Sequence, residues 1–472
     1  MQYIENKTFD ELNIGDRAEL TRTLRKEDVE LFAVMSGDVN PAHVDEAFAK
    51  ADQFHKVIAH GMWGGALISA VLGTELPGPG TIYLNQSLSF RRPVGLGDTV
   101  TVRVTVREKL PEKKRLLLDC ECINQSGETV IKGEANVIAP SEKVRRPRAL
   151  LPEVHLHERG LRYRQLIEEA RKSHPIRTAV VHPCDSASLS WALDCASEKL
   201  IVPVLVGPED KLRKIADEAN RDLHGIEIVG AASSLAAADR AVALAREGRV
   251  DALLRGSLPT QELMGAVMKP LTGLRTERRM SHVLALDVPN YPKPLFVTDA
   301  AINGHPDLPT KRDIVRNAIE LTHALGIAEP KVAILSAIET VVPKLASRID
   351  AAALRKMSEW GQITGALVDG PLAFDTAVSK EAAKLNGVTS SVAGDADILV
   401  CPDLEAANAV ANLLVYLAGA DAAGIVLGAR VPILLRTLAG DALIRQASAG
   451  LAQLVSHHMR GTAAERIPLA AG

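Results

Sequence analysis

The residue pattern changes near position 145, and this change constrains the fold more than any other feature of the 472-residue sequence. Before it, the run Thr99–Val106 alternates apolar and polar residues with a period of two, as a half-buried antiparallel strand does. Similar β-rich runs cover Thr81–Phe90, Leu116–Ile123 and Glu128–Ile138. After it, short apolar runs alternate with Ala-rich helical stretches, which is the pattern of a parallel α/β sheet. We therefore predict two domains of different class.

The first domain is predicted to span residues 1–140. Its one apolar, small-residue segment, Gly61–Leu72, indicates a buried helix around which a curved antiparallel sheet can pack closely. Residues 141–159 are rich in proline and basic side chains, which predicts a solvated linker. The second domain is predicted over 160–472, with β-rich runs such as Thr178–Val181 and Ile398–Val400 and a helix over Leu404–Ala418.

Composition excludes several classes of function. The formal net charge is −3 and aromatic residues make up 3%, so neither a basic field nor a stacking platform points to nucleic acid. The five cysteines form no CxxC pair and no Cys/His ladder, so we expect a reducing compartment and no metal site. The sequence shows no secretory signal and no apolar stretch of membrane-spanning length, so we expect a cytoplasmic protein without a membrane partner.

Asp38 and His43 are the most informative residues of the first domain. The turn made by Asn40 and Pro41 can bring this carboxylate and this imidazole to one small volume, where they can hold a water molecule for general acid–base chemistry. The N–H of Gly61 is predicted at a helix N-terminus, where developing negative charge is favoured. Purely structural roles stay open as alternatives. Asp-Val-Asn-Pro also fits an Asx turn, and a lone histidine such as His43 is often structural. His60 also fits a role in starting the helix.

These residues resemble the MaoC-like (R)-specific enoyl-CoA hydratases, which have an α+β hot-dog fold. The resemblance runs from about residue 8 to 139 and depends on Ser36-Gly-Asp-Val-Asn-Pro-Ala-His43, Ala59-His-Gly-Met62, Tyr83–Phe90, Pro93-Val94, Gly97-Asp98 and Gly133-Glu-Ala135. It implies that Asp38 and His43 activate the water that adds to a trans-2-enoyl-CoA. It also implies substrate-side roles for Gly61, which binds the thioester oxygen, for Asn40, and for Ser69, which supports the aspartate. Arg91 and Arg92 fit either CoA phosphates or a solvated strand edge.

The second domain contains neither GxGxxG nor GxxxxGK[ST], so a dinucleotide or P-loop site lacks its main support. Its segments resemble the phosphate acetyl/butyryl transferases, on Val180–Asp185, Ile201–Gly207, Asp251–Gly256, Ser281–Val283, Thr298–Asn303, Val332–Ser336, Gly365–Asp375, Ala393–Asp397 and Gly424–Pro432. The resemblance implies two α/β subdomains with the active cleft between them, similar to isocitrate and isopropylmalate dehydrogenases. It further implies exchange of acyl-CoA plus phosphate with acyl phosphate plus CoA, without a metal or another cofactor.

Candidate residues of this cleft lie at predicted strand ends and turns, namely Arg255, Ser281, Asp299, Asn303, Asp395 and Thr437. Asp395 also fits a helix N-cap. Family members usually carry a Ser-Arg pair after the Val-Pro segment, and those positions are Thr437 and Leu438 here. Leucine cannot supply a guanidinium group, although Arg436 lies nearby.

We therefore predict a bifunctional acyl-CoA enzyme that acts on acyl-CoA and phosphate as a homodimer or a larger homo-oligomer. Two alternatives remain. In the first, the second domain is a non-catalytic ligand-binding or assembly module, which Leu438 favours. In the second, the hot-dog domain is a thioesterase, because fold alone does not decide between the two reactions.

Overall fold

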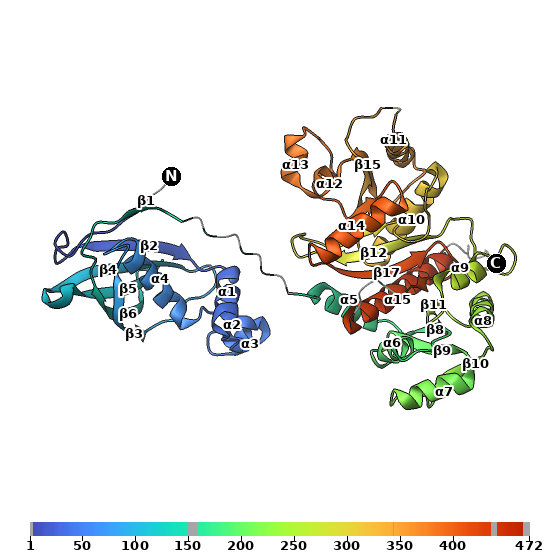
Figure 1. Ribbon diagram of the computed structural model, residues 1–472, viewed down its shortest axis with the longest axis horizontal. Helices are drawn as coiled ribbons and strands as arrows, with labels where there is room; N and C mark the ends of the chain where they lie inside the picture. Colours follow the sequence, from blue (N-terminus) through green and yellow to red (C-terminus); the bar gives the residue numbers. More distant parts are fainter. Residues whose placement is uncertain are drawn as a thin grey trace, which may run out of the picture. The chain divides into compact units, whose positions relative to one another are not determined.

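The computed structural model describes residues 3–149, 151, 154, 156, 158–342, 344–435 and 441–465. The chain forms two compact units, Met1–Leu156 and His157–Gly472, whose elements are drawn in Figure 1. Among the described helices, none combines the length and the apolar character needed to cross a bilayer.

The first unit is built on a five-stranded antiparallel sheet with the order β2-β4-β5-β6-β3. Its strands are β2 (Arg17–Thr23), β3 (Ile82–Phe90), β4 (Thr99–Leu110), β5 (Arg115–Asn124) and β6 (Thr129–Ile138). Helix α4 (Gly61–Thr74) packs against β4 and β2. The four strands and the buried helix predicted from the sequence are therefore confirmed.

The alternating pattern explains how this core forms. Val100, Val102, Val104 and Val106 of β4 are buried in one apolar cluster with Ile68 of α4, while the intervening side chains lie on the other face. Small residues allow the close packing: a Cβ atom at Gly64 would overlap with the Ile131 side chain. A Cβ atom at Gly133 would overlap with the backbone carbonyl oxygen of Ser87, so β6 and β3 can approach only through a glycine.

Three short helices lead the chain toward α4. They are α1 (Lys26–Ser36), α2 (Pro41–Val44) and α3 (Glu46–Ala51). Helix α1 ends at Gly37, whose φ of 75° is the left-handed conformation that a glycine C-cap adopts without strain. Pro41 occupies the first position of α2, where its fixed φ suits a helix start.

The predicted linker differs from the structure over its first part. Strand β7 (Arg145–Pro147) pairs antiparallel with β1 (Tyr3–Glu5), so the chain stays on the first unit beyond residue 140. The Asn6 side chain fixes this pairing: its amide donates to the Glu142 carbonyl at 2.8 Å and its oxygen accepts from the Val144 N–H at 2.8 Å. A three-residue strand carries no periodicity, so the basic and proline-rich composition alone predicted a linker here.

The second unit holds an eleven-stranded sheet with the order β10-β9-β8-β11-β18-β17-β12-β13-β16-β14-β15. The strands are β8 (Ile176–Val181), β9 (Ile201–Gly207), β10 (Glu227–Gly230), β11 (Ala252–Arg255), β12 (Ser281–Asp287), β13 (Leu295–Thr298), β14 (Lys331–Leu335), β15 (Leu367–Leu372), β16 (Ile398–Val400), β17 (Asp421–Leu427) and β18 (Ile433–Leu434).

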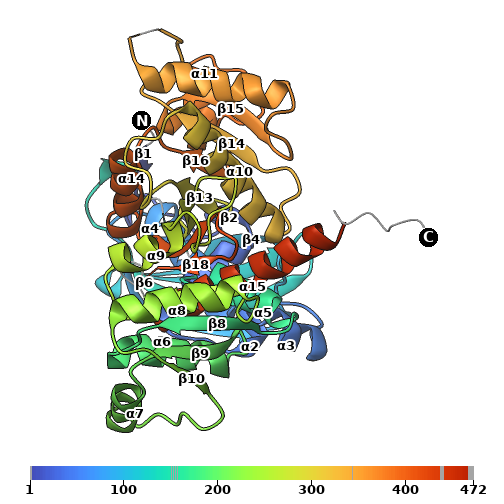
Figure 2. The same ribbon diagram turned by 90° about the vertical axis from the view of Figure 1, so that its right-hand side faces the viewer.

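Helices cover this sheet; α6 packs on β9, α8 on β8, α10 on β12 and α15 on β17 (Figure 2). The helices are α5 (Leu161–Arg171), α6 (Ser186–Ser197), α7 (Glu209–Glu218), α8 (Ser234–Arg246), α9 (Thr260–Met268), α10 (Leu308–Ala324), α11 (Ala346–Glu359), α12 (Phe374–Val378), α13 (Lys380–Leu385), α14 (Leu404–Tyr416) and α15 (Ala442–Glu465).

The predicted α/β sheet is confirmed, but it is mixed rather than parallel. Strand β12 is antiparallel to both β13 and β17, and β17 is antiparallel to β18. The strands on the β11 side therefore run opposite to those on the β13 side. Short, fully buried apolar strands carry no signal of their direction, so the sequence could not show this reversal.

Candidate active sites

Asp38, His43 and His60 converge in the first unit. One potential ligand atom from each side chain lies within 4.8 Å of the other two. Asp38 follows α1, His43 lies in α2 and His60 is the N-cap residue of α4. The structure thus brings together the two side chains that the sequence predicted to share a water molecule, while their catalytic role stays a prediction.

Hydrogen bonds between neighbouring residues shape this turn. The Asp38 N–H donates to Ser36 Oγ at 3.2 Å, and Asp38 Oδ1 accepts from the Asn40 N–H at 3.2 Å. Asn40 Oδ1 in turn accepts from the Ala42 N–H at 3.1 Å, which caps α2. The Asx-turn interpretation is therefore correct, and it coexists with the convergence of Asp38 and His43. The structure places the Asn40 side chain at a helix cap rather than against the cavity described below.

The orientation of His43 leaves one ring nitrogen available as a base. Its Nδ1 lies 2.9 Å from the Ile58 carbonyl oxygen, which can only accept a hydrogen bond. In the neutral ring the proton must therefore be on Nδ1, and Nε2 carries the lone pair. This tautomer is the one that can take a proton from water.

His60 contacts both Asp38 and His43. Its Nε2 donates to the Asp38 carbonyl oxygen at 3.0 Å, and its ring stacks on Phe32 with centroids 4.8 Å apart. The centroid of the His43 ring lies 4.1 Å from that of His60. His60 Nδ1 is buried and has no hydrogen-bond partner among the described residues. The sequence suggested a role for His60 at the helix start but not its contact with Asp38, because that contact spans 22 positions.

A cavity of about 340 Å³ opens beside these imidazoles. Gly61 lines it as the first residue of a 14-residue helix, so its N–H has no acceptor within the helix. A Cβ atom at this position would lie 3.1 Å from Phe90 Cε1, which is closer than most real Cβ contacts, so a side chain here would crowd the Phe90 ring. The other lining residues are His43, Phe54, Ile58, Ala59, His60, Trp63, Gly64, Phe90, Arg91, Arg92, Pro93, Val94, Val100, Val130 and Ile131.

Ser69 does not meet Asp38 in the structure. It is exposed, and it lies eight positions beyond Gly61 on α4, which is about 12 Å along a helix axis. No hydrogen bond joins Ser69 to Asp38 in the described part of the chain. The resemblance implied that Ser69 supports Asp38, and its position on the same helix as Gly61 did not show that it lies away from Asp38.

In the second unit the structure brings together Ser281, Asp299 and Asn303. Asp299 Oδ2 accepts from the Asn303 side-chain amide at 2.6 Å and from its backbone N–H at 3.0 Å. Asp299 Oδ1 accepts three backbone N–H groups, those of His282, Ala301 and Ile302, at 3.0–3.1 Å. The Asp299 carboxylate is thus a buried anchor for the loop after β13. Ser281 is also buried and accepts from the Asn317 side-chain amide at 2.9 Å.

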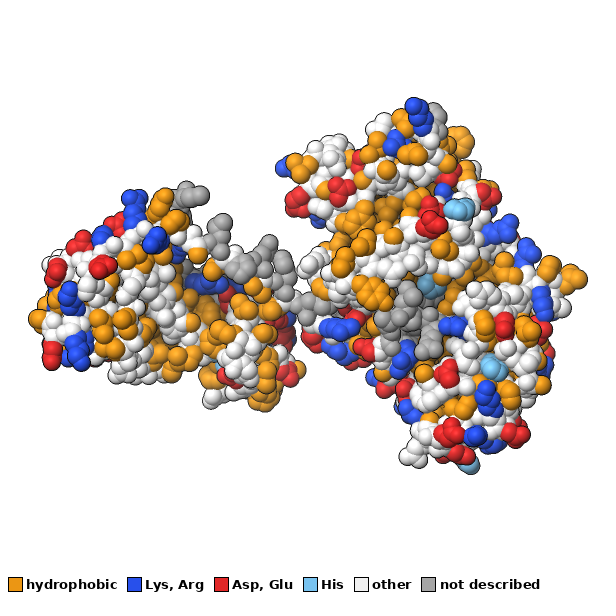
Figure 3. Space-filling view, viewed as in Figure 1, with side chains coloured by type: hydrophobic (Ala, Val, Ile, Leu, Met, Phe, Trp, Pro, Cys, Tyr) orange, Lys and Arg blue, Asp and Glu red, His pale blue; other side chains and the backbone are white. Residues whose placement is uncertain are grey.

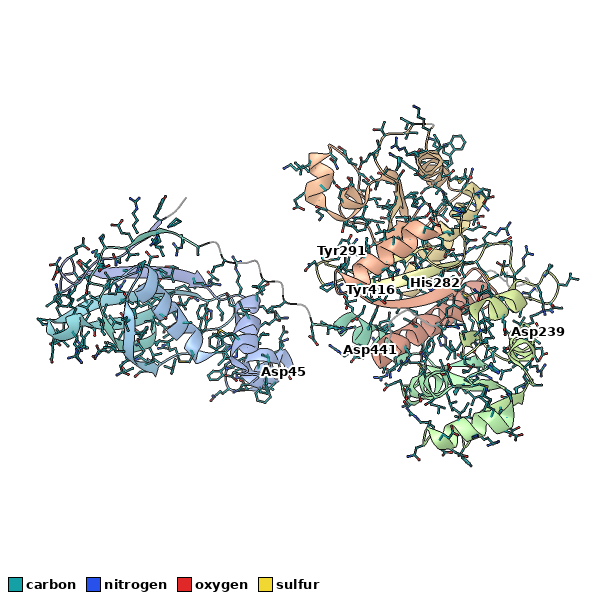
Figure 4. All side chains as sticks on the ribbon, in the orientation of Figure 1. Asp45, Asp239, His282, Tyr291, Tyr416 and Asp441 are labelled. Carbon is teal, nitrogen blue, oxygen red and sulfur yellow. The ribbon has the colours of Figure 1, made fainter. Side chains whose placement is uncertain are left out.

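His282, which Figure 4 labels in the second unit, belongs to this cluster through its backbone N–H and was not among the candidate residues predicted from the sequence. Burial lowers the pKa of its imidazole, and the nearby Asp299 carboxylate acts in the opposite direction. Its Nδ1 is buried without a hydrogen-bond partner among the described residues. A Cβ atom at Gly424 would lie 2.8 Å from His282 Nε2, so the ring lies directly over that glycine. The Ser281–Val283 motif was the available signal.

Arg255 and Asp395 lie apart from this cluster. Strands β18, β17 and β12 separate β11 from β13, and β11 and β13 run in opposite directions, so Arg255 and Asp299 end them at opposite edges. Asp395 precedes β16, which is parallel to β13, so it too lies at the other edge from Asp299. Its helix N-cap interpretation is wrong, since a strand follows it.

Asp395 instead forms ion pairs with two lysines. Its carboxylate contacts the Lys331 ammonium, and it lies 3.1 Å from Lys293 Nζ. The Lys331 hydrogen bond lowers the pKa of the Asp395 carboxyl. Thr437 and Leu438, with Arg436, lie outside the described residues.

Two family models match the chain. A model described as phosphate acetyl/butaryl transferase matches residues 234–439, and one described as MaoC like domain matches residues 12–117. A phosphate acetyltransferase of Rhizobium meliloti is 54% identical over 299 residues, which cover 63% of this chain and 95% of that protein.

Two solved structures are similar to parts of this chain. A branched-chain phosphotransacylase from Enterococcus faecalis V583 is 27% identical, with a TM-score of 0.53, over 60% of this chain and 99% of that one. The R-hydratase PhaJ1 from Pseudomonas aeruginosa is 47% identical, with a TM-score of 0.32, over 33% of this chain and 100% of that one.

Proposed function

The chain belongs to the phosphate acetyl/butaryl transferase family through its second unit and carries a MaoC-like domain in its first, and from this premise we propose that it is a bifunctional acyl-CoA enzyme. In this proposal the first unit hydrates a trans-2-enoyl-CoA to an (R)-3-hydroxyacyl-CoA. The second unit exchanges the CoA of an acyl-CoA for phosphate. The predicted fusion of the two families is confirmed; the two reactions are the proposal.

The observation that carries the hydratase proposal is the convergence of Asp38 and His43 with the His43 tautomer set by Ile58. A water molecule held between the carboxylate and Nε2 loses a proton to His43 Nε2 as its oxygen bonds to C3 of the enoyl group. The electron pair of the C2–C3 double bond forms a C1–C2 double bond, and the carbonyl electron pair moves onto the thioester oxygen, where the Gly61 N–H stabilises the negative charge. C2 then takes up a proton from the Asp38–His43 pair as the carbonyl re-forms, which completes the addition of one water molecule.

The apolar wall of the cavity supports an acyl substrate. Phe54, Val94 and Ile131 are among its lining residues, and these side chains suit a short or medium hydrocarbon chain beside the imidazoles. Arg91 and Arg92 also line it. We propose that they contact the CoA phosphates, although Arg92 also pairs with Glu128 at 3.2 Å.

The substitution Asp38→Asn tests this proposal with crotonyl-CoA. Loss of the carboxylate should lower the hydration rate by at least about 10². Full activity of this variant would remove the dyad assignment. If the wild-type protein releases free CoA from crotonyl-CoA without prior hydration, a thioesterase is favoured instead.

The proposal for the second unit rests on its 54% identity to a phosphate acetyltransferase. In the proposed reaction a phosphate oxygen bonds to the thioester carbonyl carbon, the carbon–sulfur bond breaks, and the departing CoA thiolate takes up a proton. The buried cluster of Ser281, His282 and Asp299 supports a polar site at this edge of the sheet. We propose acyl-CoA and phosphate as substrates and no additional cofactor.

Leucine at position 438 keeps a non-catalytic second unit as the competing proposal. Phosphate-dependent release of CoA from acetyl-CoA and butyryl-CoA separates the two directly. If CoA is released only at a background rate that does not depend on phosphate, the non-catalytic module is favoured. A rate that rises in Leu438→Arg would show that the missing guanidinium limits the reaction.

We also propose that the chain forms a homodimer or a larger homo-oligomer. Strand β3 has no partner strand on its outer side within the described residues, and its Leu84 and Phe90 side chains are exposed. In the second unit, hydrophobic side chains gather over α14 (Figure 3), including Tyr416 and Leu417. Light scattering that finds only a 50.5 kDa species would contradict this proposal.

A further inference from the structure

We infer that Asp38, His43 and His60 form a site for one divalent transition-metal ion of the Zn²⁺ class, and that the ion blocks hydration when it binds. The three side chains offer one carboxylate oxygen and two imidazole nitrogens, which is a donor set suited to zinc and its neighbours. The sequence analysis led us to expect no metal site, and the ligands come from three separate segments of the chain, so no local spacing marks them.

The hydrogen bonds of the two imidazoles match those of metal ligands. A ligating histidine generally donates its second ring N–H to a carbonyl or carboxylate, which fixes the tautomer and aims the free nitrogen. Here His43 Nδ1 donates to the Ile58 carbonyl at 2.9 Å, and His60 Nε2 donates to the Asp38 carbonyl at 3.0 Å. The nitrogens left with lone pairs are His43 Nε2 and His60 Nδ1.

His60 supplies an independent indication of a ligand. Its side chain is 3% exposed, and its Nδ1 has no hydrogen-bond partner in the described part of the chain. A buried polar atom without a partner is destabilising, whereas a bound cation would satisfy it. Its only role in the proposed hydration is to support Asp38 through Nε2, so Nδ1 is unused by that reaction.

The distances allow an ion after a small movement. Ligand atoms about 2.1 Å from a tetrahedral ion lie about 3.4 Å apart, and one potential ligand atom from each of the three side chains lies within 4.8 Å of the other two. The Asp38 side chain is exposed and can rotate toward the buried His60. The cavity beside His43 and His60 provides a route of entry, and a fourth coordination position stays open for water.

Binding of an ion and hydration exclude each other. The ion would occupy the lone pair of His43 Nε2 and an oxygen of Asp38, which are the groups that hold the water in the proposed reaction. This second half of the inference rests on the proposed function, whereas the site itself rests only on the geometry.

The test uses the metal-free full-length protein titrated with Co²⁺, whose visible absorption reports the ligand geometry, followed by competition with Zn²⁺. In His60→Gln the new amide can still donate to the Asp38 carbonyl, but Nδ1 is lost. His55→Gln is the matched control, since His55 is exposed on the same unit and outside the cluster.

We expect one ion bound by the wild type and by H55Q with the same affinity, and at least about tenfold weaker binding by H60Q. Asp38→Asn should weaken metal binding to a similar extent. Because Asp38 is exposed, this variant shows the loss of a ligand even if H60Q fails to fold. Unchanged binding in both H60Q and D38N, or no binding by the wild type, would overturn the site.

The activity assay separates the two halves of the inference. We expect Zn²⁺ to lower hydration of crotonyl-CoA at least about tenfold, with recovery after addition of EDTA. If the variants bind the ion more weakly but Zn²⁺ does not inhibit the wild type, the metal site stands and the proposed blocking of hydration is overturned. Metal binding by a protein that hydrates no enoyl-CoA would leave the site and contradict the proposed function.

Discussion

The substitution His43→Asn removes the proposed base, Nε2, but keeps the hydrogen bond that positions the side chain against the Ile58 carbonyl. The amide of asparagine can take the place of Nδ1 and donate to the Ile58 carbonyl, which His43 contacts at 2.9 Å. No atom of asparagine replaces Nε2, so the proton acceptor is lost. The change therefore removes one function of the imidazole and preserves the other.

The expected magnitude follows from these two contributions. Loss of a positioned general base lowers the rate by about 10²–10⁴, or about 3–5 kcal/mol of transition-state stabilisation. The retained hydrogen bond, worth about 1 kcal/mol, should keep the stability of the first unit close to that of the wild type. His43→Ala loses both, so it should be as inactive as the asparagine variant and less stable.

The assay follows the loss of the enoyl thioester absorbance of crotonyl-CoA in the full-length protein. The value of KM should change little, because the cavity wall is preserved, while kcat falls. The exposed His55→Asn is the matched control. A kcat within about threefold of the wild type in H43N would refute the reasoning, since a positioned base contributes far more than that.

Three further predictions concern packing, charge and assembly. Gly133→Ala should destabilise the first unit by at least about 3 kcal/mol because its Cβ would overlap with a β3 carbonyl, and hydratase activity should be lost faster on heating. Gly73→Ala is the control: its Cβ would meet open space, so this variant should be as stable as the wild type or more stable. Because its ion pairs lower the pKa of Asp395, the wild type should be more stable than Asp395→Asn above about pH 4, and acid-unfolding curves should converge as pH falls further. Leu84→Lys should shift the mass in light scattering toward 50.5 kDa; an unchanged mass would exclude β3 as the interface.

Sequence patterns predicted the elements better than their pairing. The alternation over Thr99–Val106 and the apolar segment Gly61–Leu72 gave β4 and α4 nearly to their observed bounds, because burial of one face directly shapes such patterns. The pairing of β1 with β7 and the reversal of β12 and β13 were not predictable, since they depend on contacts between distant segments of low periodicity.

The candidate sites show the same division. Asp38 and His43 are five positions apart across a proline turn, so local geometry was enough to bring them together. His60 and His282 acquire their significance from partners or neighbours 17 to 22 positions away, the Asp38 carbonyl and Asp299, which no local spacing reveals. Asp395 was grouped with Asp299 because both lie at predicted strand ends or turns, but the strand directions place them at opposite edges.

The configuration of the product formed from crotonyl-CoA tests the central claim most directly. Purified full-length protein should convert it to 3-hydroxybutyryl-CoA of the R configuration, with the thioester intact and the rate abolished in the Asp38 and His43 variants. The S enantiomer, or free CoA released without a hydroxyacyl product, would contradict the assignment of this dyad to water addition.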